Sequence, residues 1–225
     1  MDKPTDTIQE IRNLARTLDG IDLPTYAEFD RDPMHPIIGC GPADAPVCFM
    51  GRDPGRDEVR LGLPFVGEAG QLLRATLHAH LHPGAPYSFE AGLQSGTAMF
   101  WMNTVPYKPL RNKVWGAEVR KRFHPCMARL LSLWHGADVV TLGNEAFFWF
   151  GIGQGRAVRE MLRRFWDSGD VRYERSAEVC LNLDGGDRSL RIHPLPHPSR
   201  ANTVWCQRFP DLLARRLAAI LTRAR

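Results

Sequence analysis

The pattern of hydrophobic and polar positions predicts strands and helices that alternate along the chain. Short apolar runs bounded by Gly, Pro and Asp are typical of buried strands, whereas apolar residues spaced three and four apart are typical of helices. The runs that predict strands are 47–51, 98–103, 138–143, 179–183 and 190–194. The segments that predict helices are 5–19, 68–81, 118–134, 144–166 with a glycine break, and 203–223.

Apolar strands that alternate with helices indicate a parallel sheet covered on both faces. We therefore predict an α/β fold, a three-layer α/β/α sandwich with a central, mainly parallel sheet of four strands. The length of 225 residues favours one domain over residues 1–225, with the helix at about 5–19 packed on it. Ligands of such sheets bind beyond the carboxyl ends of the strands. The segments expected to meet there are 51–55, 103 onward, 143–144 and 193–200.

Composition and charge exclude several classes of protein. With 44% hydrophobic and 24% charged residues, the sequence is that of a globular protein rather than a disordered one. No apolar run approaches the ~20 residues of a membrane span, and the N-terminus lacks the features of a secretory signal. We therefore expect a cytoplasmic protein that does not bind membranes. The net charge of +4, carried mostly by Arg, is compatible with nucleic acid as a partner.

Polar motifs stand at three of the predicted strand ends. Taken singly, each has a structural interpretation: a turn for Asp-Pro-Gly, a cap for the asparagine, a core ring for the phenylalanine and a backbone donor for the histidine. Taken together, they favour one functional site. The motifs are Gly51-Arg52-Asp53-Pro54-Gly55 followed by the stretch 62–73, then Asn103, then Leu195-Pro196-His197-Pro198-Ser199.

These motifs resemble those of the uracil-DNA glycosylase superfamily, and most closely those of its iron-sulfur class. The stretch 62–73 resembles that class's G-x-PFVG-x-AG-x-LL pattern, 195–199 resembles its HPS motif, and Asn103 stands where a base-reading asparagine is kept. The resemblance covers about residues 47–205. It implies a DNA glycosylase that hydrolyses the N-glycosidic bond of a flipped-out deoxyuridine in base excision repair. The implied partner is DNA, as a single strand or a U:G duplex, and we expect a monomer.

The chemistry of this hydrolysis gives each residue of the set a role. An oxocarbenium-like sugar needs nearby negative charge, which Asp53 supplies while it orients a water. A neutral His197 stabilises the departing base at O2. Asn103 matches the N3–H and O4 edge of uracil, and Phe65 offers a ring for stacking. The catalytic candidates are therefore Asp53 and His197, and the substrate-binding candidates are Gly51, Arg52, Phe65 and Asn103.

Further residues are candidates for DNA contacts. Three follow the histidine, where the resemblance places a phosphate-binding serine and a minor-groove wedge, although the bulky apolar residue often used as a wedge is missing. Two belong to the basic loop 107–113, which is either a phosphate clamp or a solvated loop. The aromatic run 147–150 indicates core packing rather than a stacking platform. The DNA-contacting candidates are Ser199, Arg200, Asn202, Lys108 and Arg111.

The sequence departs from the resemblance at the cysteines of the iron-sulfur cluster. The class uses four cysteines, of which Cys126 matches the last, whereas Tyr107 stands at about the third position. Cys40 and Cys48 lack the paired spacing of the first two, and the five cysteines include no Cys-x-x-Cys pair. Because a cluster requires its thiolates, we expect no iron-sulfur cluster and no other cofactor. Packing around Tyr107 would then hold this region.

The carboxylate of the first motif has also moved. The iron-sulfur class places it directly after the first glycine, where Arg52 stands, whereas Asp53 matches the Asp of GQDPYH in another class of uracil-DNA glycosylases. Gly55 replaces the tyrosine that excludes thymine in that motif. The base removed is therefore open between uracil and another deaminated base such as hypoxanthine. A catalytically silent module that binds damaged or single-stranded DNA is the alternative from a different class.

A third interpretation is a metal hydrolase, which needs several ligands at one place. His193 and His197 have the i, i+4 spacing of helical metal ligands, but prolines at 194, 196 and 198 forbid a helix there. The sequence therefore disfavours this interpretation. Its ligand set would be Asp53, His124, His193 and His197.

Overall fold

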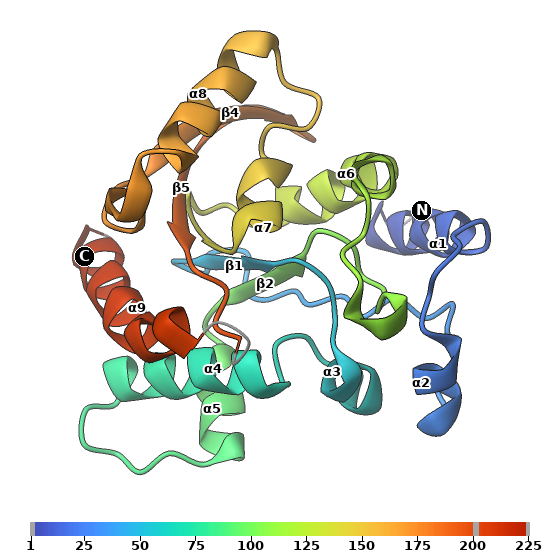
Figure 1. The fold of residues 1–225 in the computed structure, drawn as a ribbon, viewed down its shortest axis with the longest axis horizontal. Helices are drawn as coiled ribbons and strands as arrows, with labels where there is room; N and C mark the ends of the chain where they lie inside the picture. Colours follow the sequence, from blue (N-terminus) through green and yellow to red (C-terminus); the bar gives the residue numbers. More distant parts are fainter. Residues whose placement is uncertain (1–2, 200–202, 224–225) are drawn as a thin grey trace.

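The computed structural model describes residues 3–199 and 203–223. At its centre is one five-stranded sheet in the order β2-β1-β3-β5-β4. Figure 1 shows this sheet with helices around it. The parallel strands are β1 (Cys48–Gly51), β2 (Phe100–Asn103), β3 (Asp138–Leu142) and β5 (Gly186–Leu195), and β4 (Ala177–Leu183) runs antiparallel to β5 at one edge. The predicted α/β fold with a mainly parallel sheet is confirmed, but the sheet has five strands rather than four.

The additional strand arises from a hairpin between β4 and β5. Gly185 and Gly186 have φ angles of 110° and 116°, which glycine adopts without steric cost. Along β4 buried and exposed residues alternate, as expected for an edge strand covered on one face. The sequence predicted each arm of the hairpin as a separate strand, and both strands belong to the same sheet.

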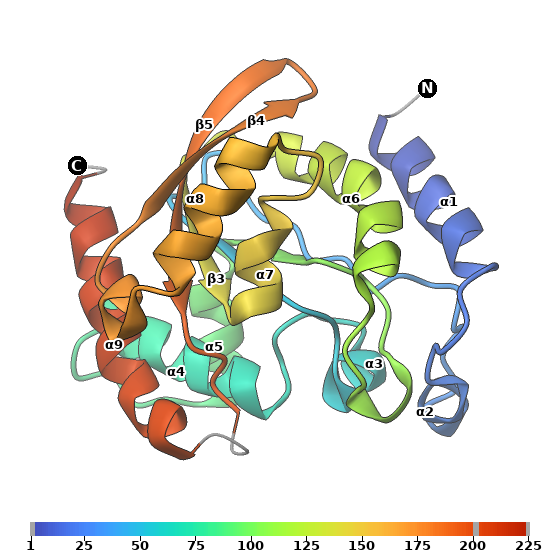
Figure 2. The same cartoon turned by 45° about the horizontal axis from the view of Figure 1, so that its top comes forward.

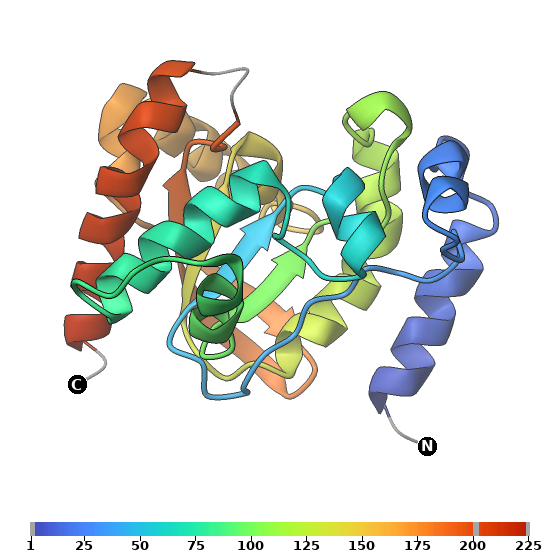
Figure 3. The ribbon, with the colours of Figure 1, turned by 90° about the horizontal axis from the view of Figure 1, so that it is seen from below.

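The two faces of the sheet carry different helices, because successive strand residues point to opposite sides. Cys48 and Met50 of β1 pack in one core cluster and Phe49 in the other. Figures 2 and 3 show the two helical layers with the sheet between them, which confirms the three-layer sandwich. The first layer holds α1 (Lys3–Ala15), α6 (Ala117–Ser132), α7 (Asn144–Trp149) and α8 (Arg156–Trp166), and the second holds α4 (Glu68–Leu81) and α9 (Thr203–Arg223).

The N-terminal helix α1 packs on α6, which lies between it and the sheet (Figure 2). Ile11 is fully buried in this contact. On its outer side, Arg122 of α6 donates a hydrogen bond of 2.6 Å to Thr17, just after α1. The helix predicted for about 5–19 is thus present with its end at Ala15. That residues 1–225 form one domain stays a prediction.

Several short helices were not predicted, because elements of three to eight residues carry too little hydrophobic periodicity to be visible. Conversely, α9 continues through Pro210, where the sequence allowed either one helix or two. In the described part of the chain, no helix combines the length and apolar character needed to cross a membrane. The unpredicted elements are α2 (Leu23–Glu28), α3 (Arg56–Leu61), α5 (Phe89–Gly96) and the 3-10 helices Leu110–Asn112 and Gly169–Tyr173.

Candidate functional site

A small pocket lies at the carboxyl ends of the parallel strands. β1 and β2 end in register, with Gly51 opposite Asn103, and the pocket beyond them has a volume of about 60 Å³. All six residues predicted for catalysis and substrate binding line it; their roles stay predictions. The lining residues are Gly51, Arg52, Asp53, Glu58, Phe65, Ala69, Gly70, Asn103, Leu142 and His197.

Two glycines allow side chains from different segments to share the pocket wall. A Cβ atom on Gly51 would lie 2.6 Å from Asn103 Oδ1 and 2.8 Å from Phe65 Cζ. A Cβ atom on Gly70 would lie 2.2 Å from the carbonyl carbon of Phe65. Only glycine permits such close approach, so these two positions set the place of the Phe65 ring and the Asn103 amide.

Phe65 is held in a strained conformation. Its φ is 57°, which costs a residue other than glycine about 1 to 3 kcal/mol. The buried Arg74 donates Nε to the Phe65 carbonyl at 2.7 Å and Nη2 to the Pro64 carbonyl at 3.1 Å. The Arg74 guanidinium also stacks over the Trp101 ring at 4.3 Å. Burial lowers the pKa of Arg74 to about 10, so the guanidinium is still a cation at neutral pH.

The buried carboxylate of Glu58 joins the two halves of the first motif. It accepts hydrogen bonds from the backbone N–H of Gly55 at 3.0 Å, of Val66 at 3.0 Å and of Gly67 at 2.8 Å. The first donor follows Asp53 and the other two follow Phe65. Because charge-assisted hydrogen bonds are strong, Glu58 fixes the distance between these two pocket residues.

Asp53 presents a buried carboxylate to the pocket. Only 5% of its side chain is exposed, and it accepts a hydrogen bond of 2.8 Å from Arg52 Nε. Burial raises the pKa of Asp53 to about 6, although the Arg52 charge and hydrogen bond oppose this rise. The carboxyl group is therefore ionised at neutral pH and protonated in mild acid.

His197 stands at the exposed mouth of the same pocket. Removal of water by the surrounding protein and the charge of Arg52 lower the pKa of His197 below 6.5. The imidazole is therefore neutral at pH 7. No side chain or backbone group within 3–199 and 203–223 hydrogen-bonds the ring, so its N–H can donate to a ligand.

The Asn103 side chain is also available to a ligand. It is 5% exposed, lines the pocket, and forms no hydrogen bond to any other described residue. Its position is fixed by the next residue, since Thr104 donates from N to Gly51 O at 3.0 Å and from Oγ1 to Arg52 O at 2.6 Å. A buried amide normally pairs its donor and acceptor, so this one is suited to a polar ligand edge.

The predicted DNA contacts beyond His197 are only partly described. Ser199 is half-buried, and its backbone N–H donates to the His197 carbonyl at 2.9 Å. Arg200 and Asn202 lie outside the described residues.

The basic loop after Asn103 differs from its prediction at Lys108. The Lys108 ammonium is buried and donates to Asp22 at 2.6 Å and to Asn112 Oδ1 at 2.9 Å. A buried, paired ammonium cannot reach a phosphate, so the structure does not support Lys108 as a DNA clamp. Arg111, by contrast, is exposed.

The residues at the expected cluster site do not fit an iron-sulfur group. Tyr107 is fully buried, its hydroxyl donates to the Met34 carbonyl at 3.1 Å, and its ring lies 5.9 Å from that of Phe123. Cys126 donates to Glu10 at 3.5 Å, and burial raises the pKa of its thiol to about 11. The described residues contain no group of three or more His, Cys, Asp or Glu placed to hold a metal ion.

The four ligands of the metal-hydrolase interpretation are dispersed. Only two of them, the Asp and the last His, line the pocket. His193 is fully buried and its Nε2 pairs with Asp138 at 2.7 Å. The His124 ring packs on Trp149 with 4.4 Å between centroids. These residues do not form one ligand set.

Sequence reasoning missed three residues around the pocket. Glu58 belongs to the first motif, but nothing in its spacing showed that it accepts hydrogen bonds from three backbone N–H groups. Arg74 interrupts the apolar face of the predicted helix 68–81, but from the sequence alone this interruption does not indicate that the cation is buried. Glu145 lies in the first turn of α7, shortly after β3. Its charge adds to the rise that burial causes in the pKa of Asp53 and opposes the fall that burial causes in the pKa of His197.

Comparison with known families agrees with this geometry. The family model described as the uracil DNA glycosylase superfamily matches residues 38–221, and the chain belongs to that superfamily. It is similar to a protein of Thermotoga maritima named Type-4 uracil-DNA glycosylase, with 25% identity over 125 residues. That match spans 56% of this chain and 59% of the relative.

Proposed function

We propose that this chain hydrolyses the N-glycosidic bond of a deoxyuridine extruded from DNA, as the first step of base excision repair. The observation that carries the proposal is the meeting of Asp53, Asn103 and His197 with the Phe65 ring in one pocket. These side chains come from four separate segments. They supply a carboxylate, a free amide, a neutral imidazole and an aromatic ring, which are the groups that the reaction requires.

The amide and the ring would recognise the base. Asn103 donates to O4 and accepts from N3–H of uracil, a pairing that cytosine cannot reproduce because it has an amino group at that edge. Phe65 stacks on the base, a contact worth about 1 to 3 kcal/mol. Its rigid support by Arg74 keeps the ring in place before the base arrives.

The carboxylate and the imidazole would perform the hydrolysis. As the C1′–N1 bond breaks, its electron pair leaves with the base, and the ionised Asp53 stabilises the positive charge of the sugar. A water oriented by Asp53 adds to C1′ and gives up a proton to that carboxylate. His197 donates to O2 of the departing uracil anion, an effect worth about 3 kcal/mol. Protonation of the anion by solvent completes the release of uracil and leaves an abasic site.

A silent module that binds damaged DNA is the second candidate. The observation that favours it is the ion pair between Arg52 and Asp53, because it offsets the negative charge that the sugar cation needs. In this case the pocket would hold an extruded base without breaking its bond. Binding of uracil-containing DNA by a folded protein that releases no base would support this candidate.

The choice of base depends on the residue at position 55 in the first motif. At Gly55, where the resemblance places a tyrosine that excludes thymine, a Cβ atom would lie 2.8 Å from Glu58 Oε2. The glycine therefore accommodates the Glu58 contact and leaves no side chain to screen the 5-methyl group. Hypoxanthine and thymine are the competing bases to test beside uracil. We further propose a cytoplasmic monomer of one domain that acts on a single strand or a U:G duplex.

The test is release of free base from labelled single-stranded and U:G duplex oligonucleotides, followed by alkaline cleavage at the abasic site. We expect uracil release by the wild type, and a loss of at least about 100-fold in Asp53→Asn and in His197→Ala. Asp57→Asn, on the neighbouring carboxylate, is the matched control and should cleave like wild type. Equal cleavage by all four proteins would refute the site assignment.

A further inference from the structure

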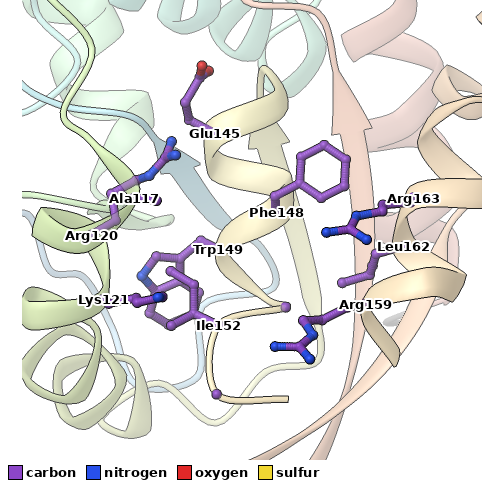
Figure 4. A pocket seen from close by; sticks show the side chains of 12 residues that line it. Ala117, Arg120, Lys121, Glu145, Phe148, Trp149, Ile152, Arg159, Leu162 and Arg163 are labelled. Atoms are coloured by element: carbon purple, nitrogen blue, oxygen red, sulfur yellow. The ribbon is translucent and has the colours of Figure 1, made fainter. Parts of the chain in front are cut away.

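A larger pocket opens between α6, α7 and α8 (Figure 4). Its volume of about 340 Å³ is within the range of ligand pockets. We call it the α6–α8 groove. Its cations are Arg120, Lys121, Arg159 and Arg163, its one carboxylate is Glu145, and Phe148, Trp149, Ile152 and Leu162 form its apolar floor.

The charge of the groove selects an anionic ligand. Figure 4 shows Arg120 and Lys121 on the α6 side and Arg159 and Arg163 on the α8 side, with α7 between them. Arg159 and Arg163 form no ion pair with any other described residue. Lys121 is paired with Glu118 at 2.8 Å, so the excess rests on the three arginines, which face the single carboxylate of Glu145. A positive excess of this kind attracts polyanions.

Arg120 provides an independent sign of a missing acceptor. Its Nη1 atom is buried and has no hydrogen-bond partner in the described part of the chain. A guanidinium nitrogen without an acceptor is costly, and this one belongs to a side chain that lines the groove. An anion bound in the groove would satisfy it.

The floor of the groove offers an aromatic surface between the cations. In the run 147–150, Phe147, Trp149 and Phe150 are fully buried, as expected of core residues, whereas Phe148 is half-buried and lines the groove. Aromatic rings flanked by cations bind single-stranded nucleic acid, because bases stack on the ring while phosphates contact the cations. A duplex keeps its bases paired, so only an unpaired base can reach Phe148.

The groove is next to the pocket at the strand ends. Glu145 lines the groove, and its charge acts on both Asp53 and His197. A Cβ atom on Gly143, just before α7, would lie 3.4 Å from His197 Cβ and 3.9 Å from Glu145 Oε2. A strand whose target base occupies the pocket can therefore continue past Glu145 into the groove.

We propose that the α6–α8 groove binds a single-stranded segment of the DNA substrate adjoining the target nucleotide, with phosphates against the arginines and one unpaired base on Phe148. The inference rests on the proposed function only for the nature of the ligand. The binding itself does not require catalysis, so it is measured on DNA that contains no uracil.

The first measurement is the affinity for a fluorescein-labelled 20-nucleotide oligothymidylate, by anisotropy at several salt concentrations. The test variant is Arg159→Gln with Arg163→Gln. The control is Arg156→Gln with Arg164→Gln, which removes the same charge from exposed residues of α8 outside the groove. We expect the test variant to bind at least about tenfold more weakly and to lose about 1.4 from the salt slope, while the control stays within about twofold of wild type.

A second variant tests stacking without a change of charge. Phe148→Leu keeps an apolar side chain but removes the ring, and we expect it to weaken binding by about fivefold or more. Thermal unfolding of each variant shows that the fold is retained. The proposal is overturned if the test and control variants bind alike, if duplex binding falls as much as single-strand binding, or if polyglutamate competes as well as oligothymidylate.

Uracil release separates this proposal from the proposed function. On a 20-nucleotide substrate the test variant should raise KM with kcat unchanged, and on a trinucleotide substrate it should match wild type. Absence of any release, together with the binding difference above, would refute the glycosylase function and support the groove. Normal uracil release, together with equal binding by the test and control variants, would support the glycosylase function and refute the groove proposal.

Discussion

At the scale of single residues, the ionisation of Asp53 links stability to pH. Its pKa is about 6 in the folded protein against 3.8 ordinarily, so the folded state binds this proton more tightly than the unfolded chain. The stability that the proton provides is complete below pH ~4 and is lost as pH rises through about 6. We expect Asp53→Asn to be more stable than wild type at pH 8 by up to about 3 kcal/mol, and to gain less at pH 4.

Urea unfolding of both proteins at the two pH values measures this difference. A stability difference that is equal at pH 4 and pH 8 would contradict a raised pKa. The same ionisation should appear in the activity, which is expected to rise through pH about 6 because the reaction uses the carboxylate.

Gly51 is the residue whose missing side chain shapes the pocket. In Gly51→Ala the new Cβ atom meets Asn103 Oδ1 and Phe65 Cζ at less than 3 Å, so both side chains must move. A displacement of about 1 Å lowers activity by about 100-fold, and we expect a loss of that order in kcat/KM. The control is Gly116→Ala, where a Cβ atom meets nothing within 4 Å. Similar activity in the two variants would contradict the pocket geometry.

At the scale of elements, Glu58 connects α3 to the loop that precedes α4. Glu58→Gln keeps one acceptor oxygen for three backbone donors, so at least one of these N–H groups, which are buried or partly buried, loses its partner. This costs about 1 to 3 kcal/mol, and we expect a lower Tm together with weaker base release. Asp57→Asn, whose carboxylate pairs with Arg60 on the surface, should change stability by less than about 1 kcal/mol. Equal effects of the two substitutions would show that the contact does not hold the loop.

The elements differ in how well their sequences predicted them. The strands and long helices follow from local apolar patterns, and the motif residues could be placed together because parallel strands end at the same edge of the sheet. The supports of the site could not be predicted in this way. Glu58 and Arg74 act through backbone groups of other segments, and such contacts leave no periodic signal in the chain.

At the scale of the whole molecule, the ion pair between Lys108 and Asp22 joins the segment before α2 to the loop after β2. The sequence suggested a surface role for Lys108, because a basic loop looks the same whether its lysine faces water or an aspartate 86 positions away. Burial alone would raise the pKa of Asp22, but the hydrogen bonds that it accepts from Lys108 and Thr25, together with the Lys108 charge, lower it. The pair therefore persists at neutral pH.

Removing one partner of this pair should destabilise the whole fold. Breaking a buried ion pair costs about 3 to 5 kcal/mol, and we expect Lys108→Met to lower the free energy of unfolding by that amount. Arg111→Gln, on the exposed part of the same loop, should leave stability unchanged and slightly weaken DNA binding. Chemical denaturation and anisotropy measure the two effects. A stable Lys108→Met protein with weakened DNA binding would restore the phosphate-clamp interpretation.

The register between β1 and β2 has a consequence for insertions and deletions. Backbone hydrogen bonds place Gly51 opposite Asn103, so the connection between them can change length without moving either residue. The exposed stretch 82–88, which precedes α5, is the natural place for such changes. A deletion inside β2 would instead turn Asn103 to the other face of the sheet. Homologous chains should therefore differ in the length of this connection while the four residues of β2 stay uninterrupted.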